Sequence, residues 1–156
     1  MRIAGAIFIC LSGLYLSSLL VSGERARCRC VASLLALVEK TQALVESYSM
    51  SASQILASLD PELLRSCAYF GAMPPKSFSE LSECCEICDS EAREIFCAFA
   101  EDFGKNHRIR QAQKCTLCAE ALRRRADELA EETSRRKRLI SVLCICLSLV
   151  AVILLL

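Results

Sequence analysis

The sequence predicts an all-α protein in which an antiparallel helical bundle lies between an N-terminal and a C-terminal transmembrane helix. Residues 3–23 and residues 139–156 carry no charged side chain. About 20 helical residues cover the ~30 Å hydrocarbon core of a bilayer, so each segment is long enough to span it. Between them, apolar residues recur every three or four positions, which is typical of amphipathic helices. We therefore expect three parts: residues 1–23, 24–138 and 139–156.

The composition of the chain excludes two broad classes of protein. The 156 residues are 54% hydrophobic with a mean hydropathy of +0.38, above the roughly 45–50% apolar content of soluble domains. This excess argues against an ordinary soluble enzyme. The net charge is only +1, so we expect no nucleic-acid partner.

The placement of basic residues predicts the orientation in the membrane. Arg25, Arg27 and Arg29 follow the first apolar segment, and residues 135–138 precede the second. Basic residues close to a membrane segment favour the cytoplasmic side. We therefore expect a cytoplasmic central region with both termini outside. The alternative is a signal peptide cleaved after Gly23, which would leave an exported domain on a C-terminal anchor.

The first helix of the central region is expected over residues 25–48, where Cys28, Val31, Val38 and Tyr48 belong to an apolar stripe. The helix can continue directly from the membrane segment. The serine-rich residues 47–53 are expected to end it.

Short helices follow, and each has a residue type that favours a helix start. Serine and aspartate side chains cap exposed helical N–H groups, and proline is favoured at the first helical position. A Ser77-x-x-Glu80 pattern also indicates a capping box. The expected helices begin after Ser51 or Ser53, Asp60, Ser77 and Asp89, and they end near Leu59, Tyr69, Cys88 and Gly104.

A last, long helix is expected from about Arg108, because no Gly or Pro follows it. Cys115, Cys118, Leu122 and Leu129 would form its apolar stripe, and the helix would run on into the second membrane segment. Two long helices with shorter ones between them predict an antiparallel bundle.

The cysteine pattern offers a candidate metal or redox site. Two cysteine groups could together supply four ligands to zinc. Both lie at helical spacing on apolar faces, which favours buried structural thiols instead. With a single His107 and no glycine-rich phosphate loop, we expect no cofactor, no metal and no enzymatic activity. The candidate metal ligands are Cys84, Cys85, Cys88, Cys115 and Cys118.

Charged side chains on the last helix are candidates for binding a partner protein. The arginines are followed by acidic residues at helical spacing, on faces other than the apolar stripe, which also suits a solvated, salt-bridged helix face. These candidate partner-binding residues are Arg123, Arg124, Arg125, Glu128, Glu131 and Glu132.

The order of short motifs along the chain resembles the stage III sporulation protein AB family of endospore-forming bacteria. Phe103-Gly104, then Arg110-Gln111, then Lys-Arg-Leu-Ile-Ser-Val-Leu at 137–143 precede the terminal apolar run. Near the front, Leu-Val-Glu at 44–46 lies in a long helix after an arginine-rich stretch. The sequence departs from the family where Cys144, Cys146 and Ser148 replace the usual glycines, although the side chains remain small.

This resemblance implies a structural role in the transenvelope complex between mother cell and forespore. The family is similar to the cytoplasmic domain of general secretion pathway protein F. The implied partners are the secretion-type ATPase of the complex (stage III sporulation protein AA) and its other membrane subunits. The implied location is the mother-cell membrane facing the forespore. A disulfide-linked exported surface protein and a zinc or thiol-redox membrane protein remain the alternatives.

Overall fold

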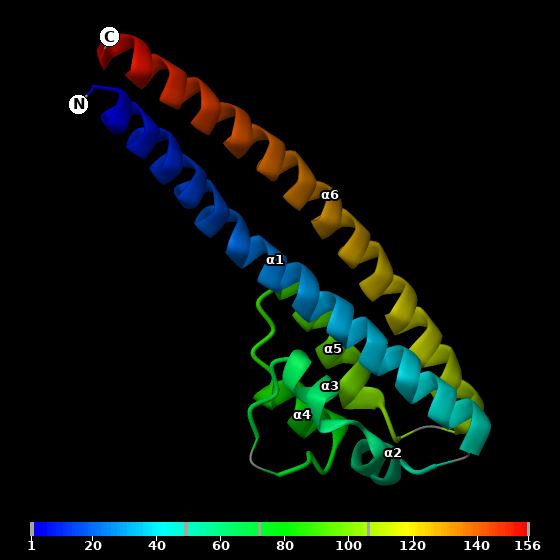
Figure 1. Cartoon of the computed structure of the whole chain (residues 1–156). Coiled ribbons are helices and arrows are strands. Elements are labelled where there is room, and N and C mark those ends of the chain that lie inside the picture. The colour runs from blue at the N-terminus through cyan, green and yellow to red at the C-terminus, as the bar shows by residue number, and fades with distance from the viewer. Residues whose placement is uncertain (1, 49, 72, 106, 156) are drawn as a thin grey trace. The chain divides into compact units, whose positions relative to one another are not determined.

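The computed structural model describes the backbone of residues 2–48, 50–71, 73–105 and 107–155. Within these ranges the chain forms six helices and no β-strand, which confirms the all-α prediction (Figure 1). The helices are α1 (Arg2–Tyr48), α2 (Ala52–Ser58), α3 (Pro61–Ser66), α4 (Phe78–Cys84), α5 (Ser90–Asp102) and α6 (Arg108–Leu155).

The chain divides into two compact units. The bundle unit is Arg27–Glu128, and the terminal unit combines Met1–Ala26 with Leu129–Leu156. The bundle unit contains the hydrophobic core together with helices α2 to α5, which lie beside the part of α1 that belongs to the same unit (Figure 1). The three-part division at residues 23 and 138 stays a prediction.

The core of the bundle unit is built from the predicted helical stripes. Val31, Leu34 and Val38 on α1 are fully buried, as are Cys115 and Leu122 on α6. Their spacing of three, four or seven residues places each set on one helix face. The stripe prediction is therefore confirmed, except at the end of α1, where Tyr48 is exposed.

A cluster of four phenylalanines fills the space between α4 and α5. The ring centroid of Phe78 lies 5.8 Å from that of Phe99 and 4.3 Å from that of Phe103, and Phe96 lies 6.1 Å from Phe99. All four side chains are buried. Burial of each contributes roughly 1.5–3 kcal/mol, so this cluster stabilises the pairing of the two helices.

The predicted capping residues start the short helices. Ser51 forms a full capping box with Gln54, and Asp60 precedes Pro61 and accepts a hydrogen bond from the Glu62 N–H at 2.9 Å. Ser77 also caps α4, but its box is incomplete. The Glu80 carboxylate accepts from the N–H of Lys76 instead of Ser77.

Two helices end earlier than the sequence predicts. We expected ends near Tyr69 and Cys88, but α3 stops at Ser66 and α4 at Cys84. The reason is a tertiary contact: Tyr69 and Cys85 pair in an isolated antiparallel bridge. The N–H of Glu86 also donates to the Ala68 carbonyl at 3.2 Å. Extended backbone at this bridge cannot continue either helix.

The terminal unit consists of the first part of α1 and the last part of α6. A salt bridge of 2.8 Å between Arg136 Nη1 and Glu24 Oε1 joins the two helices. Over the described residues, no helical stretch is both long and apolar enough to cross a membrane. Most side chains of the predicted spans, residues 1–23 and 139–156, lie outside the described residues.

Candidate functional site

Asp89 is the one charged residue in the buried class among those that the structure describes, with 1% of its surface exposed. It is the N-cap of α5, and its Oδ1 accepts from the Ala92 N–H at 2.9 Å. The sequence predicts this cap but not its burial. A buried carboxylate requires strong partners, because removing an unpaired charge from water is very unfavourable.

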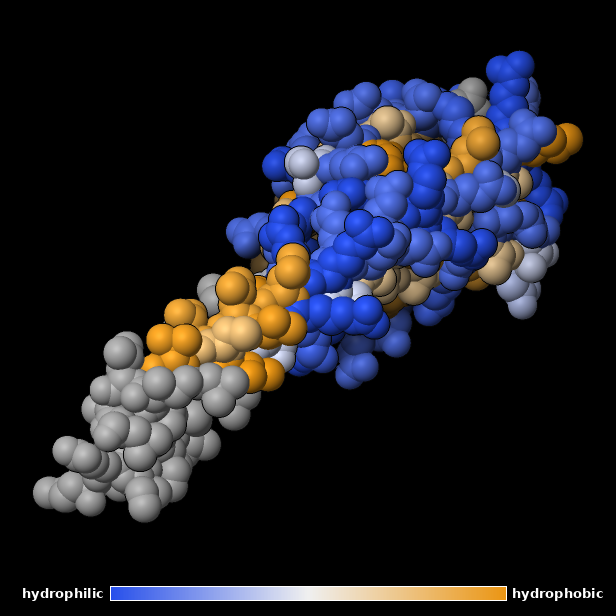
Figure 2. Space-filling view, turned by 90° about the horizontal axis from the view of Figure 1, so that it is seen from above, coloured by the Kyte–Doolittle hydropathy of each residue, from blue (hydrophilic) through white to orange (hydrophobic). Residues whose placement is uncertain are grey.

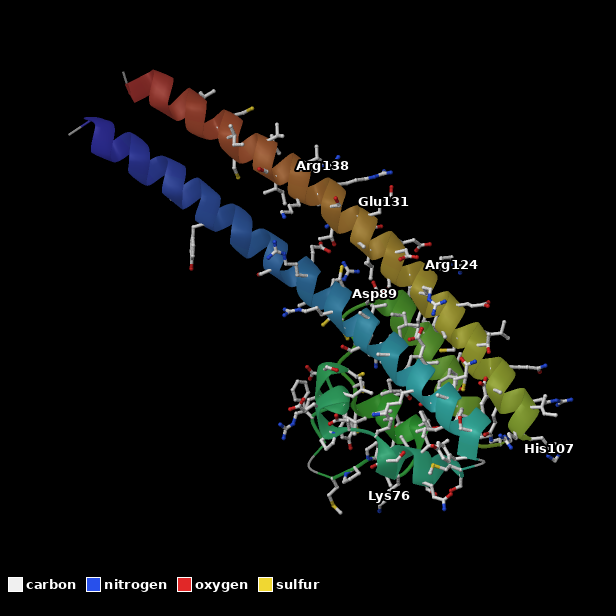
Figure 3. All side chains as sticks on the ribbon, turned by 45° about the vertical axis from the view of Figure 1, so that its right-hand side comes forward. Lys76, Asp89, His107, Arg124, Glu131 and Arg138 are labelled. Atoms are coloured by element: carbon white, nitrogen blue, oxygen red, sulfur yellow. The ribbon has the colours of Figure 1, made fainter. Side chains whose placement is uncertain are left out.

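Two arginines from helices distant in the sequence supply those partners; Figure 3 labels Asp89 itself. Arg125 on α6 donates from Nε to Oδ1 at 3.1 Å and from Nη2 to Oδ2 at 3.0 Å, and Arg27 on α1 donates to Oδ2 at 2.7 Å. The Arg125 hydrogen bonds hold the pKa of Asp89 well below its usual range. The same contact raises the pKa of Arg125. The cluster therefore keeps its charges at neutral pH and links α1, α5 and α6.

Arg125 consequently has a structural role that differs from its predicted role in partner binding. It is mostly buried, and its Nη1 also lies 3.2 Å from both Glu91 and Glu128. Arg123 is exposed but lies 2.5 Å from Glu39 on α1. Three of the six predicted partner-binding residues, Arg123, Arg125 and Glu128, thus form ion pairs within the bundle unit.

Of the other three predicted residues, Glu131 has an ion-pair partner, whereas Arg124 and Glu132 have none among the described side chains. Glu131 pairs with Arg135 at 2.6 Å one helical turn later. Arg124 and Glu132 are both exposed. Figure 3 labels Arg124 and Glu131 on α6. Of the charges predicted on the bundle-unit part of this helix, Arg124 is the one available to a partner.

Arg124 belongs to an exposed stripe on α6 that contains large apolar side chains. Ile109 is 74% exposed and Leu117 is 66% exposed. Spacing of three and four residues places them on one helix face with Gln113, Glu120 and Arg124. We call these five residues the outer stripe. It is one exposed face of α6 in the bundle unit, and sequence reasoning identified only its charged end.

A shallow groove of about 460 Å³ adjoins the start of this stripe. Beside it, Arg108 donates from Nε to the Val45 carbonyl at 2.9 Å and also bonds the Glu46 carbonyl. These carbonyls lie in the last turn of α1, where no further helical N–H is available. Arg108 therefore closes the end of α1 onto α6. The groove is lined by Glu46, Arg108, Ile109, Ala112, Gln113 and Thr116.

The five cysteines that the sequence offered as alternative metal ligands are not grouped to hold an ion in the described part of the chain. No group of three or more His, Cys, Asp or Glu side chains there is arranged to hold an ion. Cys85, Cys115 and Cys118 are buried, and burial raises the pKa of each thiol to about 12. Cys84 and Cys88 are exposed, so their prediction as apolar-face residues was wrong. All described cysteines are free thiols.

Comparison with known proteins identifies a family. Neither the curated proteins nor the solved structures contain a match to this chain. A family model described as stage III sporulation protein AB matches residues 2–156. Since the match covers nearly the whole sequence, the protein belongs to the stage III sporulation protein AB family and has a role in sporulation.

Proposed function

We propose that this protein is a non-enzymatic, membrane-anchored structural component of the complex between mother cell and forespore, and that it docks the secretion-type ATPase of that complex. The observation that carries the proposal lies on α6. Directly after the basic residues 135–138, this helix presents large apolar side chains that are 53–68% exposed. They are Leu139, Val142, Leu143, Ile145, Leu147 and Val150.

Such a run of exposed apolar side chains favours a lipid environment. Full burial of each would contribute roughly 1.5–3 kcal/mol, and water-exposed patches of this kind usually mark a membrane or protein contact. Hydrophobic atoms gather in one continuous patch of this part of the surface (Figure 2). Residues 3–23 carry no charged side chain and are long enough to span a bilayer as a helix, so they would form the second anchor.

The basic residues that border both predicted anchors support a cytoplasmic bundle unit. Lysine and arginine close to a membrane segment favour the cytoplasmic side. In this arrangement residues 24–138 lie in the mother-cell cytoplasm, and both termini lie outside. The bundle unit is then on the same side of the membrane as an ATPase that uses cytoplasmic ATP.

The outer stripe is the surface that we assign to ATPase docking. It combines the exposed Ile109 and Leu117 with the charges of Glu120 and Arg124. Exposed apolar anchors surrounded by polar groups are characteristic of protein interfaces. The neighbouring Arg123 and Arg125 already have intramolecular partners, so they contribute to the stability of the bundle unit instead.

Orientation is tested by inserting alkaline phosphatase, which is active only after export, into the loop at residues 73–77. We expect the fusion to show no phosphatase activity in intact cells. We also expect the chain to stay with the membranes when they are washed with carbonate. An active fusion would refute the cytoplasmic placement. Release of the chain by carbonate would refute the membrane anchor.

Docking is tested by co-purifying the ATPase with the full chain from solubilised membranes. The variant Leu117→Glu/Arg124→Glu should retain less than about one tenth of the ATPase, since loss of interface anchors typically exceeds 1.4 kcal/mol, or tenfold in affinity. The control is Phe70→Glu, which introduces a single glutamate at an exposed aromatic residue of the loop after α3. Equal ATPase recovery with wild type and the stripe variant would exclude this surface.

A further inference from the structure

The basic residues of the terminal unit differ in whether a carboxylate neutralises them. Arg135 Nη2 lies 2.6 Å from Glu131, and Arg136 Nη1 lies 2.8 Å from Glu24. These two pairs account for half of the basic run at residues 135–138. Their charges are balanced within the protein.

The remaining basic side chains are not balanced in this way. Lys137 and Arg138 are exposed, and within the described residues no carboxylate lies within ion-pair distance of either. The same holds for Arg25 on α1, which follows the paired Glu24. Glu24 contacts Arg136, so Arg25 on α1 and Lys137 on α6 each follow a member of this ion pair directly. Three unneutralised cations thus lie within two residues of the Glu24–Arg136 pair.

Exposed apolar side chains begin at the next residue of α6. Leu139 is 65% exposed, and Val142 and Leu143 follow within one helical turn. A ligand that satisfies both features must carry a negative charge directly attached to a long apolar group. Free phosphate satisfies only the first feature, and an uncharged lipid satisfies only the second.

We propose that the terminal unit binds the phosphate group of an anionic phospholipid through Lys137, Arg138 and Arg25, with the acyl chains along Leu139 and Val142. We call these three basic residues the headgroup site. The guanidinium groups donate paired hydrogen bonds to phosphate oxygens, and the lysine ammonium adds a compact charge. This inference rests on the proposed membrane anchor and adds the class of lipid that the anchor selects.

The test measures lipid selectivity of the full chain in uncharged detergent micelles. A tail-labelled fluorescent phosphatidylglycerol is displaced by unlabelled phosphatidylglycerol, by phosphatidylcholine with the same acyl chains, or by inorganic phosphate. Each basic residue near an anionic surface is worth ~1 kcal/mol, so two or three of them predict a preference of about 30- to 150-fold for phosphatidylglycerol over phosphatidylcholine. Inorganic phosphate should not displace the probe at matching concentrations.

The variant Lys137→Gln/Arg138→Gln should reduce this preference to about fivefold or less, and Arg25→Gln alone should reduce it by about fivefold. The matched control Lys40→Gln/Arg110→Gln removes one lysine and one arginine from exposed positions of the bundle unit and should keep the wild-type preference. Circular dichroism verifies that all variants stay helical.

The outcomes test the headgroup site and the membrane anchor separately. Equal displacement by the two lipids, or an unchanged preference in the double variant, would overturn the headgroup site. Displacement by inorganic phosphate as effective as by the lipid would overturn the lipid assignment. A chain that stays in carbonate-washed membranes but shows no lipid preference refutes the headgroup site alone. A chain that carbonate releases, but that still prefers phosphatidylglycerol, refutes the anchor alone.

Discussion

Replacement of Asp89 by Asn should strongly destabilise the bundle unit. The change removes a buried negative charge but keeps a side chain that can still cap α5, because asparagine is as good an N-cap as aspartate. Loss of one member of a buried ion pair typically costs 3–5 kcal/mol. The lower end applies here, since Arg27 is 32% exposed and Arg125 keeps Glu91 and Glu128 at 3.2 Å. We therefore expect a loss of about 3 kcal/mol.

The buried thiols provide the assay. Cys67 and Cys115 are fully inaccessible in the folded chain, so they react with an alkylating reagent only when the bundle unit opens. When reclosing is faster than alkylation, the rate follows the population of the open form. A loss of about 3 kcal/mol predicts roughly 150-fold faster alkylation at neutral pH in Asp89→Asn than in the wild type. Mass spectrometry of the full chain measures this rate.

Two further variants make the result interpretable. Asp89→Ala also removes the cap, so its loss should exceed that of Asp89→Asn by about 1 kcal/mol. Glu131→Gln removes an exposed salt bridge and should change alkylation by less than about threefold. If Asp89→Asn also stays within threefold of the wild type, the buried cluster contributes no net stability and the reasoning is wrong.

The pH dependence follows from the same cluster. Hydrogen bonds from Arg125 lower the pKa of Asp89 in the folded chain. A lowered carboxyl pKa contributes stability that is complete above the unfolded value of about 3.9 and is lost as the pH falls toward the folded value. Thiol protection of the wild type should therefore decrease below about pH 4. Asp89→Asn should lack this component of the acid dependence.

Three other predictions concern separate features. Gly104 has a φ of +90°, so Gly104→Ala should destabilise the chain by about 1 kcal/mol, seen as a lower thermal midpoint; an unchanged midpoint would contradict the strain argument. Arg108→Ala removes the side chain that bonds the Val45 and Glu46 carbonyls, so hydrogen exchange should accelerate in the last turn of α1 and not in α5. Burial raises the pKa of four thiols to about 12 in the folded chain, whereas an unfolded cysteine ionises near ~8.5. Because the unfolded chain loses these protons first, the free energy of unfolding should fall as the pH rises above about 9. A flat thermal midpoint between pH 8 and 10.5 would exclude this linkage. These thiols are Cys67, Cys85, Cys115 and Cys118.

The starts of the helices and their buried faces could be read from the sequence. Ser51, Asp60, Ser77 and Asp89 each cap the helix that follows, as predicted. Capping depends on side-chain atoms within three residues of the helix start. The apolar stripes repeat with the helical period itself. Both signals are local, so a single sequence contains them.

What only the tertiary structure decided involves residues far apart in the chain. The bridge between Tyr69 and Cys85 ended α3 and α4 earlier than their local signals suggested. The three arginines at 123–125 look alike in sequence, yet Arg125 binds the buried Asp89, Arg123 pairs with Glu39, and Arg124 stays exposed. Successive helical residues point about 100° apart, so which helix each one meets depends on the packing of the whole bundle unit.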